Sequence, residues 1–262
     1  IEDDEALSLF ADTIKTLSDH STDATVMLVG VADSIDELVG DHLSIERPLV
    51  QVQMPRMSKK ELGELIDKGC QRLNMSMVAH ARSDVIRLAE GLPYYAHLLC
   101  LHAFQRSVMD DREKVNAADI TAAIDLGVQK AQHSIRSAYQ KATRSPRKDN
   151  LFKQVLLACA LAPKDELGYF TASGVRDPMT AIMQQKYEIP AFARHLKEFT
   201  SENRGMVLKK SGTERRWFYR FSNPLVQPFV ILHSLARGLV SDELLTGLQS
   251  DPGRTISGAT GP

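Results

Sequence analysis

The pattern of apolar and polar positions divides the chain into three parts, of which the first predicts one helix and two strands. Between Glu5 and Leu17 apolar residues recur every three or four positions, as on one face of a helix. Residues 25–31 form a continuous apolar run rich in β-branched side chains, which favours a buried strand of a parallel sheet. Residues 49–54 alternate between apolar and polar and predict a second strand. Residues 1–57 are therefore expected to be α/β in character.

The second part, residues 58–145, has helical periodicity throughout. Ser58 is followed three positions later by Glu61, which predicts a capping box at the start of its first helix. Gly91 is a typical helix-end residue, and Asn116 is a typical helix cap. Further helices are expected over residues 78–90, 93–109 and 116–142.

The third part, residues 146–240, predicts three helices, a hairpin and a last helix. The preceding stretch 144–149 is polar, contains a proline and indicates a hinge. Helices followed by a hairpin with a Ser-Gly turn have the order of a winged helix. Residues 241–262 become rich in Gly, Ser, Pro and Thr and predict a disordered tail. The helices are expected over residues 151–161, 177–185, 190–200 and 224–239, and the strands over residues 206–210 and 215–221.

Charge is distributed unevenly along the 262 residues, although the net charge is only −1. Residues 1–57 carry 3 basic and 12 acidic side chains, whereas residues 146–230 carry 14 basic and 8 acidic ones. A basic back part indicates a nucleic-acid or acidic partner, with chance variation of the surface as the alternative. The ordinary composition excludes wholesale disorder. No apolar run is long enough to span a membrane, and no basic segment followed by an apolar core in this sequence predicts a signal peptide.

Cysteine and histidine give no sign of a metal site or a disulfide framework. The three cysteines Cys70, Cys100 and Cys159 are widely spaced in apolar stretches, which predicts buried free thiols in a reducing cytoplasm. His97 and His102 are five positions apart on a predicted helix, which is a poor spacing for shared metal ligation. Partly buried or surface histidines are the simpler interpretation.

Five segments in this order resemble the back half of an AAA+ ATPase. The chain is similar, over about residues 1–143, to the branch of replication-initiator (origin-recognition-like) and STAND-related ATPases. The resemblance implies a mainly α protein with an α/β remnant: partial AAA+ core strands over 1–57, a four-helix lid over 58–145 and a C-terminal winged helix over 146–240. The segments are Val29–Ser34, His42–Arg47, Met54–Met57, Glu61–Ile66 and Leu88–Pro93.

The resemblance also implies roles for individual residues of the first part. Asp33 or its neighbour Ser34 stands where the family has its sensor 1 residue, a polar group at the end of a buried strand. Arg47 stands where the family places an arginine finger, which would act on the nucleotide of a neighbouring copy and imply a homo-oligomer. The alternatives are that Asp33 caps the following helix and that Arg47 forms a surface salt bridge.

Two further pairs of residues fall near the nucleotide in the resemblance. Met54 and Arg56 lead into the lid, where they would flank the adenine or, for Arg56, compete for the finger role. Pro93 and Tyr94 match the start of the sensor 2 helix, but no arginine occurs from Leu92 to Phe104. A sensor 2 contact with phosphate is therefore not expected. For the methionines Met54 and Met57, hinge packing is the simpler interpretation.

The phosphate-binding loop of such an ATPase is missing from this sequence. A P-loop needs a glycine-rich turn followed by lysine and a hydroxyl residue, yet no Gly-Lys dipeptide occurs in the chain. A strand ending in an acidic pair is also missing. Since the first residue is Ile1 rather than methionine, we expect a piece of a longer chain. The parent is expected to bind ATP and Mg²⁺, whereas this piece should neither hold them tightly nor hydrolyse ATP alone.

Basic residues interleaved with aromatic ones mark the candidate winged helix. They would neutralise the phosphates of double-stranded DNA, with Trp217 stacking or wedging. The alternative is a module for protein contacts, in which Trp217, Tyr219 and Phe221 form one buried face of the strand and Arg216, Phe218 and Arg220 the other. The candidate DNA-binding residues are Arg194, Lys197, Lys209, Lys210, Arg215, Arg216 and Trp217.

Two functions of different classes follow from these patterns. In the first, the chain is the C-terminal portion of a cytoplasmic ATP-binding protein, whose nucleotide state controls a winged helix that binds DNA or protein. In the second, the chain is a non-enzymatic winged-helix module for DNA or protein binding. The sequence upstream of Ile1 would discriminate them, because only the first requires a phosphate-binding loop.

Overall fold

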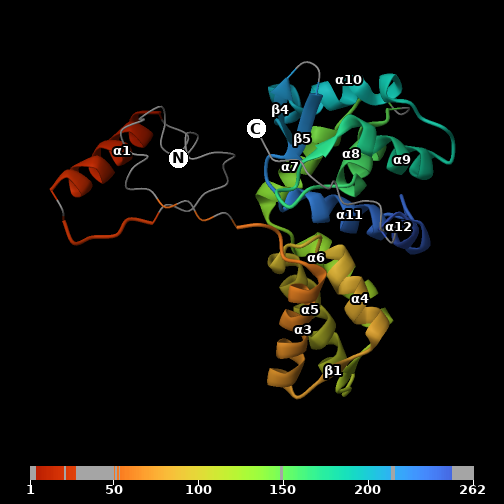
Figure 1. The fold of residues 1–262 in the computed structure, drawn as a ribbon. Helices are drawn as coiled ribbons and strands as arrows, with labels where there is room; N and C mark the ends of the chain where they lie inside the picture. Colours follow the sequence, from red (N-terminus) through yellow and green to blue (C-terminus); the bar gives the residue numbers. More distant parts are fainter. Residues whose placement is uncertain are drawn as a thin grey trace. The chain divides into compact units, whose positions relative to one another are not determined.

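A computed structural model of the chain describes residues 4–20, 22–27, 50, 52, 54–147, 150–213 and 216–249. The protein is mainly helical with a few small strands, as the periodicity predicted (Figure 1). It divides into two compact units, residues 1–54 and residues 55–262. None of the helices in the described ranges combines the length and apolarity needed to cross a bilayer.

The first unit contains the predicted helix, α1 (Asp4–Asp19), and most of the two predicted strands lies outside the described residues. Among residues 22–27, 50, 52 and 54, the part of this unit after α1 that the structure describes, no strand forms. The apolar side chains there are exposed instead of buried. An apolar run becomes a strand only when neighbouring strands satisfy its backbone groups, and the described residues provide no such neighbour. The exposed side chains are Val26, Met27, Val50, Val52 and Met54.

The second unit begins with helices at the predicted positions. The predicted capping box precedes α3 (Lys59–Leu73): the backbone N–H of Glu61 donates to Ser58 Oγ at 3.2 Å, and the N–H of Ser58 donates to the Glu61 carboxylate at 2.8 Å. Helix α4 (Ala79–Leu88) ends shortly before Gly91. Helix α5 (Pro93–Met109) has the predicted bounds, because proline at the first position fits a helix start.

The predicted long helix after Asn116 forms as two helices. Helix α6 (Ala117–Lys130) and helix α7 (His133–Thr143) are separated by Ala131 and Gln132, whose ψ angles of 145° and 143° are extended. Both residues carry helix-compatible side chains, so local propensity gave no sign of the break. Two short parallel strands, β1 (Ser76–Met77) and β2 (Lys114–Val115), join the start of α4 to the start of α6.

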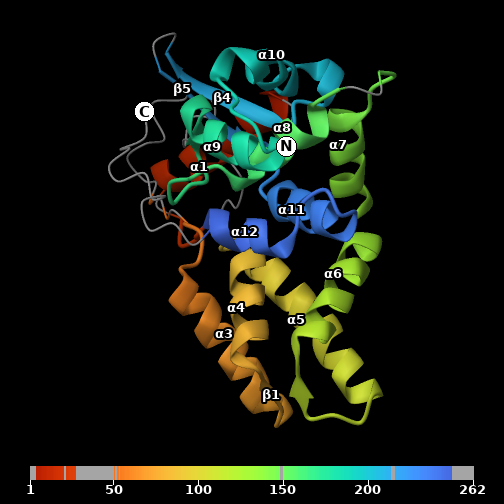
Figure 2. The same ribbon diagram turned by 90° about the vertical axis from the view of Figure 1, so that its right-hand side faces the viewer.

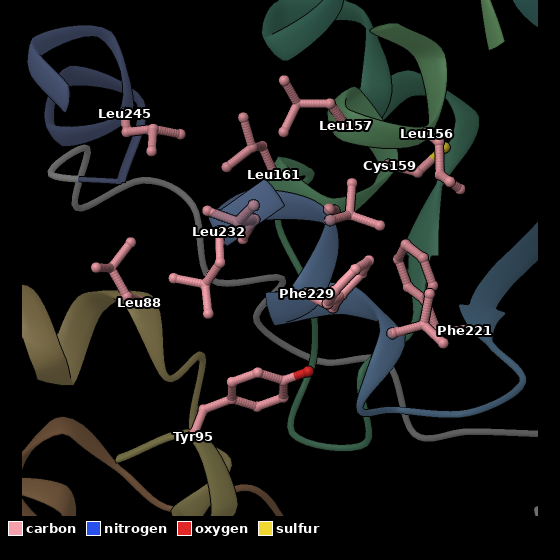
Figure 3. Close-up of a cluster of buried hydrophobic side chains, with 14 of the residues drawn as sticks. Leu88, Tyr95, Leu156, Leu157, Cys159, Leu161, Phe221, Phe229, Leu232 and Leu245 are labelled. Carbon is pink, nitrogen blue, oxygen red and sulfur yellow. The ribbon is translucent and has the colours of Figure 1, made fainter. Parts of the chain in front are cut away.

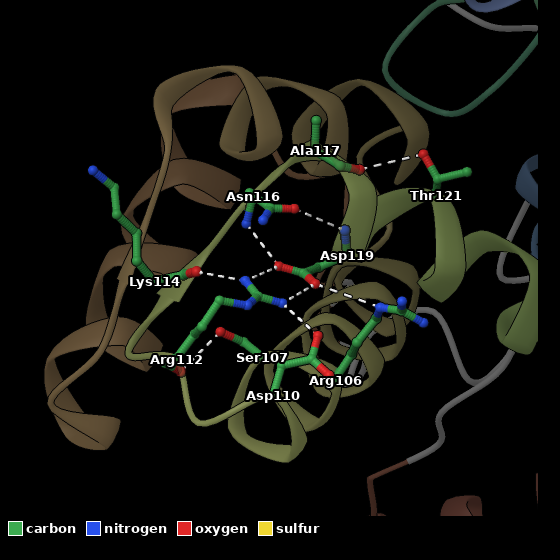
Figure 4. Close-up of polar contacts among 9 residues, drawn as sticks. All are labelled: Arg106, Ser107, Asp110, Arg112, Lys114, Asn116, Ala117, Asp119 and Thr121. Carbon is green, nitrogen blue, oxygen red and sulfur yellow. Dashed lines mark hydrogen bonds and ion pairs between the residues drawn. The ribbon is translucent and has the colours of Figure 1, made fainter.

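A buried carboxylate organises the turn before α6. Asp119 is 1% exposed and accepts hydrogen bonds from Arg112 Nη1 at 2.9 Å and Nη2 at 2.7 Å (Figure 4). It also accepts the backbone N–H of Asn116 at 2.8 Å and thereby completes the second predicted capping box. The Arg112 guanidinium holds the pKa of Asp119 below its usual range, so this carboxylate is charged at neutral pH.

The C-terminal part of the second unit combines helices with a small antiparallel sheet in the order β3-β5-β4. Helix α10 and strands β4 and β5 lie together at the end of this unit opposite α3 and β1 (Figures 1 and 2). Its elements are α8 (Phe152–Leu161), β3 (Phe170–Thr171), α9 (Ala172–Met183), α10 (Ile189–Phe199), a 3₁₀ turn (Glu202–Arg204), β4 (Leu208–Thr213), β5 (Arg216–Phe221), α11 (Val226–Ala236) and α12 (Asp242–Gln249).

Three details of this part differ from the expected pattern. Helix α9 begins five residues earlier than residue 177, because Thr171 Oγ1 accepts the N–H of Gly174 and caps it. The Ser-Gly pair lies inside β4 rather than in the turn, and Gly212 is paired with Trp217. The segment expected as a tail from residue 241 instead begins with α12, where Leu245 is fully buried.

One hydrophobic core runs through the described part of the second unit, from Leu62 to Leu245. Helix α11 packs against α6, α7 and α8. Tyr95 from α5 reaches this core and donates its hydroxyl to the carbonyl of Leu225 at 2.6 Å (Figure 3). Arg204 adds a link, since its guanidinium lies 3.6 Å from the Phe152 ring and binds the Arg144 carbonyl. A hinge at residues 144–149 would have to open this shared core.

Two partly buried histidines make the stability of this core sensitive to pH. His195 lies against the Phe152 ring, and His233 lies against the Tyr139 ring. Burial lowers the pKa of both imidazoles, which disfavours their charged forms in the folded state. Unfolding then takes up protons, so stability is greatest above the ordinary histidine pKa and falls as pH drops through it.

We expect the urea midpoint of unfolding to fall between pH 7.5 and pH 5.5. The free energy of unfolding can fall by at most about 1.4 kcal/mol per pH unit for each full proton that unfolding takes up. The double variant His195→Gln, His233→Gln should show a smaller fall. His97→Gln is the control because His97 is exposed on α5. An unchanged pH dependence in the double variant would assign the effect to other groups.

Candidate nucleic-acid interface

Helix α10 has one apolar face in the core and one exposed face. Phe192, Leu196 and Phe199 are buried at the three- and four-residue spacing that places them on one side of a helix. Arg194 and Lys197 lie on the exposed side, where the sequence predicted them. The apolar face therefore fixes the helix to the core and leaves its two basic residues facing solvent.

The hairpin of β4 and β5 carries the second group of predicted residues. The strands pair from Leu208 opposite Phe221 to Thr213 opposite Arg216. Gly212 has φ of +104°, and a Cβ on it would lie 2.4 Å from the Arg216 carbonyl oxygen, so only glycine fits there. Lys209, Lys210 and Arg216 are exposed along the hairpin.

Aromatic rings hold some of these cations at fixed positions. Lys210 Nζ lies 3.5 Å from the centre of the Trp217 ring, and the Arg216 guanidinium lies 5.0 Å from that of Phe218. Both aromatic side chains are half-buried in the packing of the sheet, so the rings that contact the two cations are themselves held in place. The hairpin thus presents positive charges in an ordered arrangement, which costs less conformational entropy on binding than free side chains would.

Acidic side chains neutralise part of this charge. Arg194 Nε donates to Glu198 Oε1 at 2.8 Å, four residues further along α10. The other carboxylate oxygen of Glu198 lies 3.4 Å from Arg204 Nε. Among the predicted DNA-binding residues that the structure describes, Lys197, Lys210 and Arg216 are in no ion pair that meets a 4.0 Å limit.

Arg220 departs from the predicted alternation along β5. The pattern placed it on the polar face, yet it is only 8% exposed, as buried as its neighbour Tyr219. Strand β5 is the central strand of the sheet, and its later residues are covered on both faces. The Arg220 guanidinium lies 5.3 Å from the centre of the Tyr169 ring. Arg220 is therefore part of the sheet packing rather than of the exposed basic surface.

The residues predicted near a nucleotide are divided between the two units. Met54 is 86% exposed in the first unit, and Pro93 is the first residue of α5 in the second. Tyr94 is half-buried and packs edge-to-face on Tyr95 with ring centres 5.1 Å apart. Asp33, Ser34 and Arg47, together with Arg215 of the hairpin, lie outside the described residues, so their predicted roles stay predictions.

Arg56 has a structural role that the sequence did not suggest. Its Nη1 donates to the backbone carbonyl of Glu90 at 2.8 Å, and its backbone N–H donates to that of Glu166 at 3.3 Å. Burial lowers the pKa of the guanidinium, which the Glu90 and Asp165 carboxylates partly offset. Gly91 and Gly168 both approach its side chain closely. Arg56 thus joins the turn between α4 and α5 to the loop before β3.

Glu90 extends this link to the C-terminal helices. Its backbone is left-handed, with φ of +50°. One carboxylate oxygen accepts Gln227 Nε2 at 2.8 Å, and the other accepts Gln249 Nε2. Gln227 also donates to the Ala160 carbonyl at 3.0 Å. Sequence reasoning missed this cluster, since its members are separated by up to 159 positions and share no motif.

An acidic cluster between α4 and α12 is an ion-pair network rather than a metal site. His80, Asp84 and Asp242 bring three possible ligand atoms within 4.8 Å of one another. Arg87 Nη2, however, donates to Asp84 at 2.8 Å and to Asp242 at 2.6 Å. The guanidinium already supplies the positive charge that a cation would bring, and the network fastens α12 to α4.

Comparison with known proteins gives no independent assignment. A scan against models of protein families finds none that matches the chain, and a search of curated proteins finds no significant match. The functional argument therefore depends on the fold and on the exposed basic residues of α10 and the hairpin.

Proposed function

We propose that residues 146–240 form a winged helix that binds double-stranded DNA. The order α8-β3-α9-α10-β4-β5 supports this proposal, because a third helix followed by a hairpin is the arrangement that the sequence predicted. The sheet order β3-β5-β4 is also consistent with the proposal, because the short strand β3 pairs with β5 and joins the hairpin to the helices. In such a fold α10 would lie along a groove, with the hairpin as the wing beside it.

The observation that carries the proposal is the placement of the exposed basic residues. Lys197 on α10, Lys209 and Lys210 on β4, and Arg216 on β5 belong to elements that lie together at one end of the unit (Figure 2). DNA binding releases counterions, so four phosphate contacts would give a slope of about −3.6 for log K against log salt. Between 50 and 200 mM salt the affinity would then fall roughly 100-fold.

Charge reversal tests this proposal directly. We expect the variant Lys197→Glu, Arg216→Glu of the full chain to bind a 24-base-pair duplex at least about tenfold more weakly at 50 mM salt, with a shallower salt slope. Both side chains are exposed, so the fold should tolerate the change. Fluorescence anisotropy of labelled duplex gives the affinities.

The matched control is the variant Lys59→Glu, Lys60→Glu at the start of α3. It changes the net charge by the same amount, and both residues are exposed in another part of the unit. If the control weakens DNA binding as much as the variant Lys197→Glu, Arg216→Glu does, the net charge of the chain rather than this surface is responsible. If the unsubstituted chain does not bind the duplex at 50 mM salt, the alternative is favoured, a winged helix used for protein contacts.

A second proposal concerns residues 58–145, which would be the helical lid of a cytoplasmic AAA+ ATPase. The specific support is the turn Glu90–Pro93 between α4 and α5, which has the Gly-Leu-Pro sequence of the resemblance. The parent would bind ATP and Mg²⁺, and Arg47 would serve a neighbouring copy in a homo-oligomer. Since lid and winged helix share one core, a movement of the lid would carry the winged helix with it.

The coding sequence upstream of Ile1 tests the second proposal. A glycine-rich loop ending in Gly-Lys-Thr or Gly-Lys-Ser, followed by an apolar strand ending in two acidic residues, would support a nucleotide-driven switch. Without them, the chain is a non-enzymatic winged-helix module, and the first proposal stands alone.

A further inference from the structure

We infer that α10 does not read bases and that the chain binds duplex DNA of any sequence through its phosphates. This inference rests on the proposed DNA binding and specifies its ligand. It follows from which side chains α10 exposes, from the ion pairs that engage the others, and from the chemistry of the hairpin.

The first half of α10 exposes no hydrogen-bonding side chain. Pro190, Ala191 and Ala193 are the exposed residues there. A helix in the major groove uses its N-terminal residues to contact base edges, and discrimination comes mainly from Arg, Lys, Asn or Gln. An alanine methyl offers only contact with the methyl group of thymine. The half of the helix that would enter the groove thus lacks the groups that distinguish base pairs.

The charged residues on either side of this half form two separate ion pairs. Before the helix, Lys186 Nζ lies 3.1 Å from a Glu188 carboxylate oxygen. After it, Arg194 is held by Glu198 at 2.8 Å, which takes up the Nε of its fork. Bidentate recognition of guanine through Nε and Nη2 would require Arg194 to leave this carboxylate, and recognition through Nη1 and Nη2 would have to be made with Nε still bound to it. Lys197 stands one turn further along, near the end of the helix.

The hairpin is suited to phosphates rather than to bases. Lys209 and Lys210 carry compact point charges that contact phosphate without a preferred plane. One face of the Trp217 ring is already covered by Lys210 Nζ at 3.5 Å, so that face cannot stack on a base. The exposed surface therefore combines strong attraction for the DNA backbone with few groups that read its sequence.

Affinities of the full chain for unrelated duplexes test the inference. Three 24-base-pair duplexes would be compared by anisotropy at 50 mM salt: one of A·T pairs, one of G·C pairs and one of mixed sequence. We expect dissociation constants within about threefold of one another, and no enriched motif when a random duplex library is selected on the protein. One bidentate base contact would produce a difference of about 5- to 150-fold.

Variants separate the possible readings. Lys197→Ala should weaken all three duplexes by the same factor, and Arg194→Ala should do the same or have no effect. Two results would overturn the inference while leaving DNA binding in place. One is a loss of affinity in Arg194→Ala for the G·C duplex alone, and the other is a difference above tenfold between the affinities of the unsubstituted chain for the three duplexes. Absence of binding to every duplex would instead overturn the proposed function, and the inference with it.

Discussion

Asp119→Ala is expected to lower the free energy of unfolding by about 3 kcal/mol. The carboxylate is 1% exposed and receives two hydrogen bonds from Arg112 and one from the backbone of Asn116. Removing it leaves a guanidinium and the start of α6 without their acceptor. The lost hydrogen bonds to a charged acceptor and the lost capping box set this cost, because the Arg112 guanidinium is 32% exposed and regains water.

Asp67→Ala is the matched control for this prediction. Asp67 also binds an arginine through two hydrogen bonds, with Arg82 Nε at 2.8 Å and Nη2 at 2.7 Å. Its side chain is 50% exposed, however, so the pair contributes about 0–1 kcal/mol. Urea unfolding of both variants measures the two losses. Equal losses would show that burial does not set the value of these pairs.

Gly91→Ala is expected to cost about 3 kcal/mol. Gly91 has φ of +78°, a left-handed conformation that disfavours alanine by about 1–2 kcal/mol. Its new Cβ would also lie 2.8 Å from Arg56 Cβ and 3.0 Å from the Met57 carbonyl oxygen. The backbone cannot easily move away, because the Met57 N–H donates to the Gly91 carbonyl at 2.9 Å. Such overpacking adds about 1–3 kcal/mol.

Gly238→Ala separates the two contributions. Gly238 is left-handed as well, with φ of +64°, but a Cβ there would meet nothing within 4 Å. We expect it to cost only about 1–2 kcal/mol, the conformational part alone. Thermal and urea unfolding of the two variants give the difference. If Gly238→Ala costs as much as Gly91→Ala, the close approach of Arg56 has no energetic weight.

Local signals in the sequence predicted the helices of the second unit well. Ser58 and Asn116 cap as expected because each bond of a capping box joins residues three positions apart. Pro93 predicted a helix start for the same reason, since its fixed φ acts on its own position. The exposed basic residues of α10 and the hairpin were also found this way, from their spacing relative to apolar neighbours.

Features that depend on distant partners were not predictable. The apolar runs at residues 25–31 and 49–54 were interpreted as strands. No strand forms at residues 25–27, 50, 52 and 54, the part of these runs that the structure describes, because a strand requires neighbours that the local pattern does not contain. Arg220 was assigned to the polar face because alternation ignores what covers a central strand. The contacts of Arg56 with Glu90 and Glu166 also join positions far apart in the chain, and no local pattern indicated them.

The stacking of Lys210 on Trp217 also allows binding to be followed by the intrinsic fluorescence of the protein. The protein has a single tryptophan, so its indole emission arises from one place, near the turn of the hairpin. The ammonium lies 3.5 Å from that ring, and indole emission responds to a charge so close. Any ligand that draws Lys210 away from Trp217 would change this signal without a label, and one that binds elsewhere in the chain would leave it unchanged.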